Sequence, residues 1–238
     1  MSAETISVAA RSPSLTTIPP STKEQIVLTA ERLFAERGID GVSLRELAAA
    51  AGNANKSAVQ YHFGTKERLV QAIFEYRLPA LTQRRRVLIA ERQPDDLRSW
   101  VECYLLPVME QGEQEGSQYV TFVVQLQRYG VGEHPFDRLP ESFKATTYDF
   151  VDRLGAMLPD IPGPLRSHRI SQAMAFCVHA SSDRERARHH GSPLLPFAVH
   201  VNDLIDGLVG FLEAPVSSKA VAALEGFHLP GPPRVVVP

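Results

Sequence analysis

Polar side chains between Gly52 and Thr65 have the chemistry needed to bind a nucleic acid. An amide such as that of Gln60 forms paired hydrogen bonds with adenine, and an ammonium group such as that of Lys56 reaches guanine or a phosphate. Contacts to phosphates position a protein on DNA, whereas contacts to base edges specify the sequence. The candidates for such contacts in this stretch are Asn55, Lys56, Ser57, Gln60, Tyr61 and His62.

Two predicted helix starts flank this stretch and offer further sites for phosphate. Ser43 and Thr65 each precede a helix, where free backbone N–H groups and the helix dipole attract an anion. Lys66 adds positive charge beside Thr65, and Arg45 lies on the outer side of the helix that Ser43 begins. Each hydroxyl can equally serve only as the cap of its helix, and Tyr61 can pack partly against the core. The sequence leaves these alternatives open.

The helices that position these residues are predicted by cap spacing and apolar periodicity. Ser43 has capping-box spacing to Glu46, and Gly52 ends the helix that they begin. A short helix follows, in which Val59 and Phe63 face inward because they are four residues apart. This order of helix, tight turn and helix predicts a helix-turn-helix, whose second helix enters the major groove of DNA.

Helical periodicity continues along the chain, and strand signals are almost absent. A helix is predicted from Ser21 or Thr22 to Gly38, and later helices at 95–113, 117–129, 138–158, 163–188, 194–213 and 217–225. We therefore predict an all-α protein in which an N-terminal three-helix helix-turn-helix domain precedes a larger C-terminal helical domain. Its parts are a disordered lead at 1–20, the helix-turn-helix domain at 21–75, the C-terminal domain at 76–226 and a proline-rich tail at 227–238.

The distribution of charge supports a nucleic-acid partner, although the net charge of the 238 residues is only −2. Residues 1–92 hold 13 basic and 9 acidic residues, which gives +4, and residues 93–238 hold 12 and 18, which gives −6. The basic excess lies in the half that carries the helix-turn-helix, as expected for a DNA-binding surface. Chance scatter of charges is the alternative.

Several other classes of protein are disfavoured by missing signals. No apolar run approaches the roughly 18 residues of a membrane span, and the N-terminus does not resemble a signal peptide. Cys103 and Cys177 form no CxxC motif, which favours a cytoplasmic protein with two buried thiols over a single disulfide. No nucleophile elbow, phosphate loop or HExxH motif is present, and the histidines lack partners at metal-ligand spacing. We expect no catalytic residue, cofactor or metal.

At the N-terminus the sequence resembles the TetR family of transcriptional regulators. The resemblance covers about residues 21–75 and is carried by Phe34 and Gly38, by SLRELA at 43–48 and by YHFGTK at 61–66. The chain has one residue more than is usual in the family between Gly52 and Phe63. The usual tyrosine of the recognition helix therefore falls at Gln60.

The resemblance implies a function as well as a fold. It implies a homodimer that binds a palindromic operator in double-stranded DNA through its three N-terminal helices. It also implies a C-terminal domain for ligand binding and dimerisation, and repression that a small, largely apolar effector relieves. One alternative is a regulator controlled by a protein partner without a small ligand. Another is a small-molecule-binding protein or enzyme with an incidental helix-turn-helix.

The C-terminal half offers candidates for a pocket and a dimer interface. Aromatic residues are frequent in its central helices, and a subset with polar anchors is expected to line an apolar cavity. The helices at 163–188 and 194–213 carry broad apolar stripes that are expected to pair with their symmetry mates, an intrachain core being the alternative. The pocket candidates are Trp100, Tyr104, Phe122, Gln125 and Phe176, and the interface candidates are Ile170, Cys177, Val201, Leu204, Leu208 and Phe211.

The run Arg84-Arg85-Arg86 looks at first like a second nucleic-acid patch. It lies about 19 residues after Thr65, where the fourth predicted helix starts, and this is roughly 28 Å along the helix axis. This is too far from a duplex held by the recognition helix. We therefore expect these arginines to form a solvated face or to bind an acidic partner surface.

Overall fold

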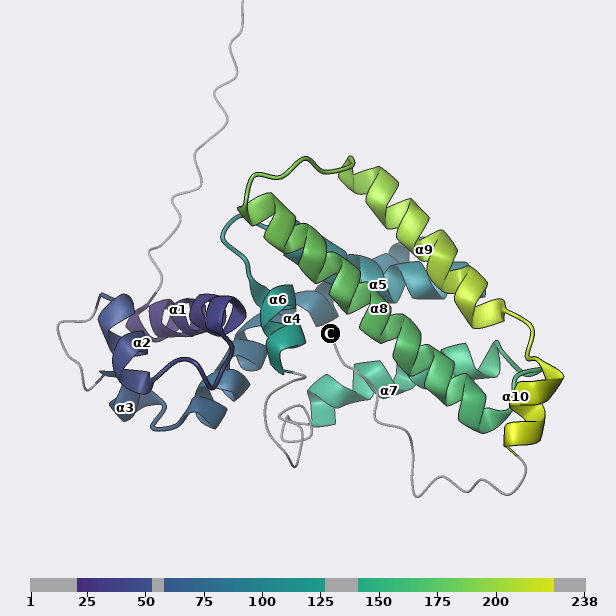
Figure 1. Cartoon of the computed structure of the whole chain (residues 1–238), viewed down its shortest axis with the longest axis horizontal. Helices are drawn as coiled ribbons and strands as arrows, with labels where there is room; N and C mark the ends of the chain where they lie inside the picture. Colours follow the sequence, from purple (N-terminus) through teal and green to yellow (C-terminus); the bar gives the residue numbers. More distant parts are fainter. Residues whose placement is uncertain (1–20, 53–57, 127–140, 225–238) are drawn as a thin grey trace, which may run out of the picture.

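Helices account for every regular element in the part of the chain that the computed structural model describes, residues 21–52, 58–126 and 141–224 (Figure 1). The all-α prediction is confirmed, whereas the lead at 1–20 and the tail at 227–238 lie outside the described residues. No helix within the described ranges is both long and apolar enough to span a membrane. In chain order the helices are α1 (Thr22–Arg37), α2 (Leu44–Ala50), α3 (Ala58–His62), α4 (Lys66–Arg92), α5 (Leu97–Glu113), α6 (Tyr119–Leu126), α7 (Glu141–Ala156), α8 (Gly163–His189), α9 (Phe197–Glu213) and α10 (Ser218–Ala223).

Local sequence signals set the starts of the N-terminal helices. The Ser21 hydroxyl accepts a hydrogen bond from the Glu24 N–H at 3.3 Å, and the Glu24 carboxylate accepts one from the Ser21 N–H at 2.7 Å. Ser43 and Glu46 form the same capping box at the start of α2, and the Thr65 hydroxyl caps α4. These side chains provide acceptors for N–H groups that have no partner within their own helix.

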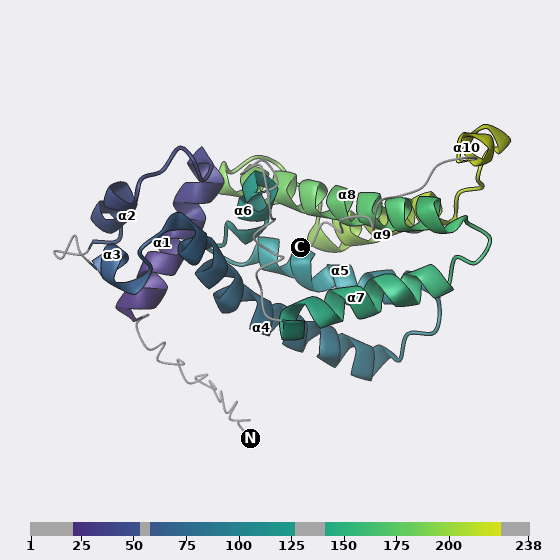
Figure 2. The ribbon, with the colours of Figure 1, turned by 90° about the horizontal axis from the view of Figure 1, so that it is seen from below.

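The buried apolar side chains form two clusters, which we call the N-terminal core and the C-terminal core. The N-terminal core joins α1, α2, α3 and the first half of α4 to α6, which comes from much later in the chain. The C-terminal core joins the end of α4 to α5, α7, α8 and α9. Figure 2 shows the helix-turn-helix at one end of an elongated molecule, with α5 between α4 and the pair α8 and α9. The long helix α4 continues through Pro79 and connects the two cores.

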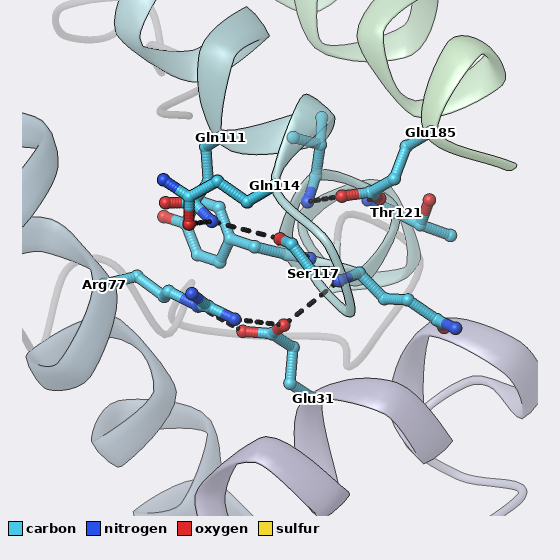
Figure 3. Close-up of polar contacts among 10 residues, drawn as sticks. Glu31, Arg77, Gln111, Gln114, Ser117, Thr121 and Glu185 are labelled. Carbon is cyan, nitrogen blue, oxygen red and sulfur yellow. Dashed lines mark hydrogen bonds and ion pairs between the residues drawn. The ribbon is translucent and has the colours of Figure 1, made fainter. Parts of the chain in front are cut away.

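The N-terminus of α6 lies where the two cores meet, and buried carboxylates accept its hydrogen bonds (Figure 3). The Gln118 N–H donates to Glu31 on α1 at 3.1 Å. The Thr121 N–H donates to Glu185 on α8 at 2.7 Å, and the Val120 N–H donates to the same carboxylate at 3.4 Å. Because these N–H groups have no partner within α6, they bind the helix both to the helix-turn-helix domain and to the C-terminal helices.

The two carboxylates differ in how their charge is balanced. Glu31 forms a bidentate ion pair with Arg77 on α4, with nitrogen–oxygen distances of 2.7 and 2.8 Å. Burial acts to lower the pKa of Arg77, but the hydrogen bonds and charge of Glu31 outweigh it and raise that pKa. No basic side chain forms an ion pair with Glu185 in the described part of the chain. Burial therefore raises the pKa of Glu185 to about 7, although hydrogen bonds from Thr121 and Val120 oppose this effect.

Both cysteines are buried and unpaired, as the sequence predicts for structural thiols. Cys103 lies on α5 and Cys177 on α8, within the C-terminal core. Burial raises the pKa of Cys177 to about 12 and also raises that of Cys103. Because the thiolate is the reactive form of cysteine, both thiols are inert members of the core.

The first prediction concerns the pH dependence of stability. Because the pKa of Glu185 rises from 4.5 to about 7 on folding, the folded chain binds more protons in this range. The contribution of Glu185 to the free energy of unfolding therefore falls as the pH rises from about 4.5 to 7. Glu185→Gln keeps an acceptor oxygen and cannot ionise. The variant should therefore lack this decrease in the free energy of unfolding, which amounts to up to about 3 kcal/mol in the wild type. Urea unfolding of both proteins at about pH 5 and pH 8 measures this difference. Equal pH dependence in the two proteins would contradict the assignment.

Candidate nucleic-acid interface

The inner faces of α2 and α3 are fixed by apolar packing. Leu47 and Ala48 on α2 are fully buried, and Val59 on α3 is 1% exposed. Phe63, directly after α3, is 8% exposed and belongs to the same N-terminal core. The spacing of these residues thus determines which side of the short helix α3 is left for a partner.

The outer face of α3 carries three polar side chains that the sequence singled out. Gln60 and His62 are exposed, and Tyr61 is 84% exposed. The Tyr61 ring contacts the His62 ring edge-on, with 5.1 Å between the ring centroids. Partial packing of Tyr61 in the core, the alternative considered from the sequence, is not observed. An amide, a phenol and an imidazole on one exposed turn have the reach for base edges and phosphates.

The turn between α2 and α3 holds the remaining candidates of this stretch. Gly52, at the start of this turn, and Gly64, between α3 and α4, have positive φ angles of 69° and 72°, which favour glycine because other residues are strained there. Asn55, Lys56 and Ser57 lie outside the described residues, as does the longer turn itself. Their contacts with DNA remain predictions.

The start of α2 is occupied by contacts within the protein. The Ser43 hydroxyl donates to the Glu46 carboxylate at 2.7 Å and accepts from the Glu46 N–H at 3.2 Å. Hydrogen bonds from the Ser43 backbone and from Arg37 lower the pKa of Glu46 to about 2. Ser43 is therefore a cap in the free protein. Arg45, two residues along α2, is exposed.

The start of α4 is likewise built into the fold. Thr65 is exposed and caps α4 through its hydroxyl. Lys66 is half-buried, and its ammonium group donates to the carbonyl oxygens of Ile39 at 2.9 Å and Asp40 at 3.3 Å. Lys66 thus holds the loop between α1 and α2 against α4, and its side chain is not directed only to solvent.

The expectation of a solvated arginine run is wrong for Arg85. Its side chain is 2% exposed, its Nε donates to the Tyr104 carbonyl at 3.0 Å, and its guanidinium carbon lies 3.8 Å from the centroid of the Tyr104 ring. Arg84 is half-buried and pairs with Glu110 of the same chain at 2.8 Å. Arg86 is exposed. Neighbouring residues on a helix point in different directions, so one charge of the run enters the core.

The five residues predicted to line a ligand pocket do not gather in one place. Trp100 and Tyr104 are buried in the C-terminal core, whereas Phe122 is buried in the N-terminal core. Gln125 lines a hollow of about 360 Å³ between α1, α6 and the end of α8. Phe176 is 58% exposed, so within this single chain its ring is not enclosed, and its place at a ligand pocket stays a prediction. Periodicity marks apolar positions but does not show which of them surround a common space.

Most of the predicted dimer interface is covered by its own chain. The side chains of five candidates are 0–8% exposed and belong to the C-terminal core, which is the alternative that the sequence left open. These five residues therefore pack within their own chain and not in a dimer interface as predicted. They are Ile170, Cys177, Val201, Leu204 and Leu208. The sixth candidate, Phe211, is 43% exposed, and the outer faces of α8 and α9 also expose Phe176 and Val199.

Three charged residues whose side chains are at most 2% exposed were not predicted to be buried: Glu31, Arg85 and Glu185. The signal for Arg85 is its helical spacing, because it follows Leu81 by four residues and precedes Leu88 by three. That spacing places the arginine on the buried face of α4. For Glu185 the sequence carries no comparable signal, because its partners are backbone N–H groups of a helix more than 60 residues away.

Comparison with known proteins identifies the helix-turn-helix. Residues 26–73 match the family model of bacterial regulatory proteins of the tetR family. The HTH-type transcriptional repressor AcnR of Corynebacterium efficiens is 38% identical over 55 residues, and AcnR of Corynebacterium glutamicum gives the same identity. The match covers 23% of this chain and 29% of each repressor, less than a third of the length of these relatives. The N-terminal domain of this chain belongs to the tetR family.

Solved structures also resemble the chain over most of its length. NalD of Pseudomonas aeruginosa, the secondary repressor of the MexAB-OprM multidrug efflux pump, is 22% identical with a TM-score of 0.47. The match covers 79% of this chain and 94% of NalD. AibR in complex with isovaleryl coenzyme A and operator DNA is 19% identical, with a TM-score of 0.47 and coverage of 82% of this chain and 100% of AibR.

The second prediction compares two aromatic residues that lie two positions apart. Phe63→Ala should lower the free energy of unfolding by about 3 kcal/mol, because it leaves a cavity in the N-terminal core. Tyr61→Ala should change it by less than about 0.5 kcal/mol, since the Tyr61 ring is exposed. Urea unfolding measures both values. A large loss of stability in Tyr61→Ala would show that its ring is part of the core after all.

Proposed function

We propose that the chain is a DNA-binding transcriptional repressor that binds a palindromic operator as a homodimer and is released by a small, largely apolar ligand. The observation that carries this proposal is the exposed polar face of α3 on a helix-turn-helix of the tetR family. We propose that the protein is cytoplasmic, because the DNA that a bacterial regulator binds lies in the cytoplasm. The repressor AcnR, to which the N-terminal domain is similar, supports the direction of control.

In this proposal α3 lies in the major groove and the flanking helix starts face the phosphates. Gln60 is the candidate for base contact, and Tyr61 and His62 are candidates for phosphate contact. Ser43, at the exposed start of α2, can accept its capping bond and still face a phosphate, because the N-terminal end of the helix attracts anions.

Dimerisation is proposed to use the outer faces of α8 and α9. Both helices pack over α5 with their inner faces, so their outer faces are free to meet a second copy. Phe176, Val199 and Phe211 are exposed there. Gly207 and Gly210 interrupt α9, yet a Cβ at either would meet nothing within 4 Å. Since glycine costs about 1 kcal/mol in a helix interior and no neighbour in this chain requires it, close approach of a partner helix explains both glycines.

The third prediction concerns DNA binding. After selection of bound sequences from random DNA, Gln60→Ala and Tyr61→Ala should weaken operator binding by about 5- to 150-fold, which corresponds to roughly 1–3 kcal/mol per contact. Gln83→Ala, on the exposed face of α4 and outside both proposed interfaces, is the matched control and should bind as the wild type does.

The salt dependence of binding separates this function from its alternatives. Affinity should fall steeply with salt, because binding to phosphates releases counterions. Absence of salt-dependent DNA binding by the folded wild type would favour a helical binding protein or enzyme. Operator binding that no small molecule affects would favour control by a protein partner.

The fourth prediction concerns the dimer. Phe176→Glu and Phe211→Glu should each convert the dimer to a monomer, because each would place an unpaired charge in an apolar interface. Tyr148→Glu on α7 is the control and should remain dimeric, since Tyr148 is 46% exposed on another helix. Sedimentation at micromolar concentration measures these states. A monomeric wild type, or dimeric Phe176→Glu and Phe211→Glu proteins, would refute the proposed interface.

A further inference from the structure

A buried positive charge without a negative partner lies inside the C-terminal core. The Arg85 side chain is 2% exposed, and none of the carboxylates in the described part of the chain pairs with it. Its Nε donates to the Tyr104 carbonyl, and the face of the Tyr104 ring lies against the guanidinium. Its Nη2 is buried and has no hydrogen-bond partner. A buried charge without a counterion is rare, because transfer of a charge from water is costly.

Two buried hydroxyl groups on α6 and α8 also lack partners. Tyr119 on α6 and Ser181 on α8 have buried hydroxyl oxygens without a hydrogen bond. Burial raises the pKa of Tyr119, and the charge of Arg85 partly offsets this. Burial also raises the pKa of Cys177, one helical turn before Ser181, and there the Ser181 hydroxyl and, less strongly, the charge of Arg85 offset it. The charge of Arg85 thus acts on Tyr119 of α6 and on Cys177 of α8, the two helices that carry the unpartnered hydroxyls. We refer to Arg85, Tyr119 and Ser181 as the cluster.

The three unpartnered groups have a common chemistry. A guanidinium N–H and two hydroxyls can all donate hydrogen bonds, and they come from α4, α6 and α8. A buried water would provide an acceptor but no compensating charge. An anion would provide both, and a carboxylate has the geometry that arginine prefers.

The surroundings of the cluster are apolar on the side of α5 and α7. The Tyr104 ring, which covers the Arg85 guanidinium, stacks on the Phe150 ring with 3.7 Å between their centroids. The Tyr104 hydroxyl is already engaged, because it donates to Thr147 at 2.6 Å. An anion bound at Arg85 would therefore have aromatic carbon beside it.

We propose that Arg85, Tyr119 and Ser181 bind the acid group of a small organic carboxylate whose apolar body lies against the aromatic side chains of α5 and α7. This inference rests on the proposed repressor function, because it names the chemical class of the effector. It also gives the ligand a path to the DNA-binding domain. Tyr119 is the first residue of α6, and the N–H of the preceding Gln118 donates to Glu31 on α1. A ligand that binds Tyr119 better in one state than in another would shift the helix-turn-helix.

The experiment measures carboxylate binding to the full chain without DNA. The probes are straight-chain monocarboxylates of four to ten carbons, benzoate and phenylacetate, each beside the alcohol of the same carbon skeleton. At least one carboxylate should raise the melting temperature in a concentration-dependent manner at up to about 10 mM, and its alcohol should do so much less. If no carboxylate stabilises the protein more than its matched alcohol, the proposal is overturned.

Variants then test whether the cluster is the site. Arg85→Met should reduce the affinity for the best carboxylate at least tenfold and leave the affinity for its alcohol unchanged, whereas Arg86→Met, the exposed neighbour, should have no effect. Tyr119→Phe and Ser181→Ala guard against a variant that fails to fold. They remove unpartnered hydroxyls, so they should keep the melting temperature of the free protein and still weaken carboxylate binding several-fold. Wild-type carboxylate affinity in Arg85→Met, or in Tyr119→Phe and Ser181→Ala together, would overturn the proposal.

A separate measurement of operator release distinguishes this inference from the proposed function. Release of DNA by a neutral ligand, with no carboxylate binding, would overturn the inference and leave the repressor function intact. A carboxylate that binds at Arg85 and does not change operator affinity would confirm the site and overturn its role as the effector site.

Discussion

The buried carboxylates of Glu31 and Glu185 hold the first turn of α6, and the arrangement of the two parts of the molecule depends on this contact. The N–H groups at a helix start must find acceptors, and at this buried position the acceptors come from α1 and α8. As a result α6 completes the N-terminal core although it follows α5 in the chain. A helix-turn-helix domain that shares its core with α6 cannot shift independently of the C-terminal helices.

Two arginines on α4, the partly buried Arg77 and the buried Arg85, differ in how their charge is balanced. Arg77 is paired with Glu31 in bidentate geometry, so its charge is balanced within the chain and joins α4 to α1. Arg85, two turns later, has an aromatic ring and a carbonyl but no carboxylate. The first arrangement needs nothing further, whereas the second is stabilised by an anion. Because the charge of Arg85 acts on Tyr119 at the start of α6 and Glu31 accepts from Gln118 just before it, both charges act on the same helix.

The sequence predicts those parts of the structure that depend on neighbours along the chain. The capping boxes at Ser21 and Ser43 and the inward anchors Val59 and Phe63 are local, and all four have the predicted places. Contacts between distant segments were not predictable in this way. The apolar stripe through Leu204 showed which face of α9 is apolar but not that the same chain covers this face. The burial of Arg85 was hidden because Arg84 and Arg86 flank it and the run looks like a charged surface. The exposed side of α3 was predictable, because the spacing of Val59 and Phe63 predicts the buried side and the exposed side lies opposite.

The central claim is that the helix-turn-helix domain and the C-terminal helices form one cooperative unit through α6. Hydrogen exchange of the full chain in increasing urea tests this claim directly, because it reports on α1 and α6 separately while the fluorescence of Trp100, the single tryptophan, reports on the C-terminal core. Amides of α1 and α6 should lose protection together with the Trp100 transition, and Glu31→Gln should make α1 open at lower urea. Opening of α1 well before the Trp100 transition in the wild type would contradict it.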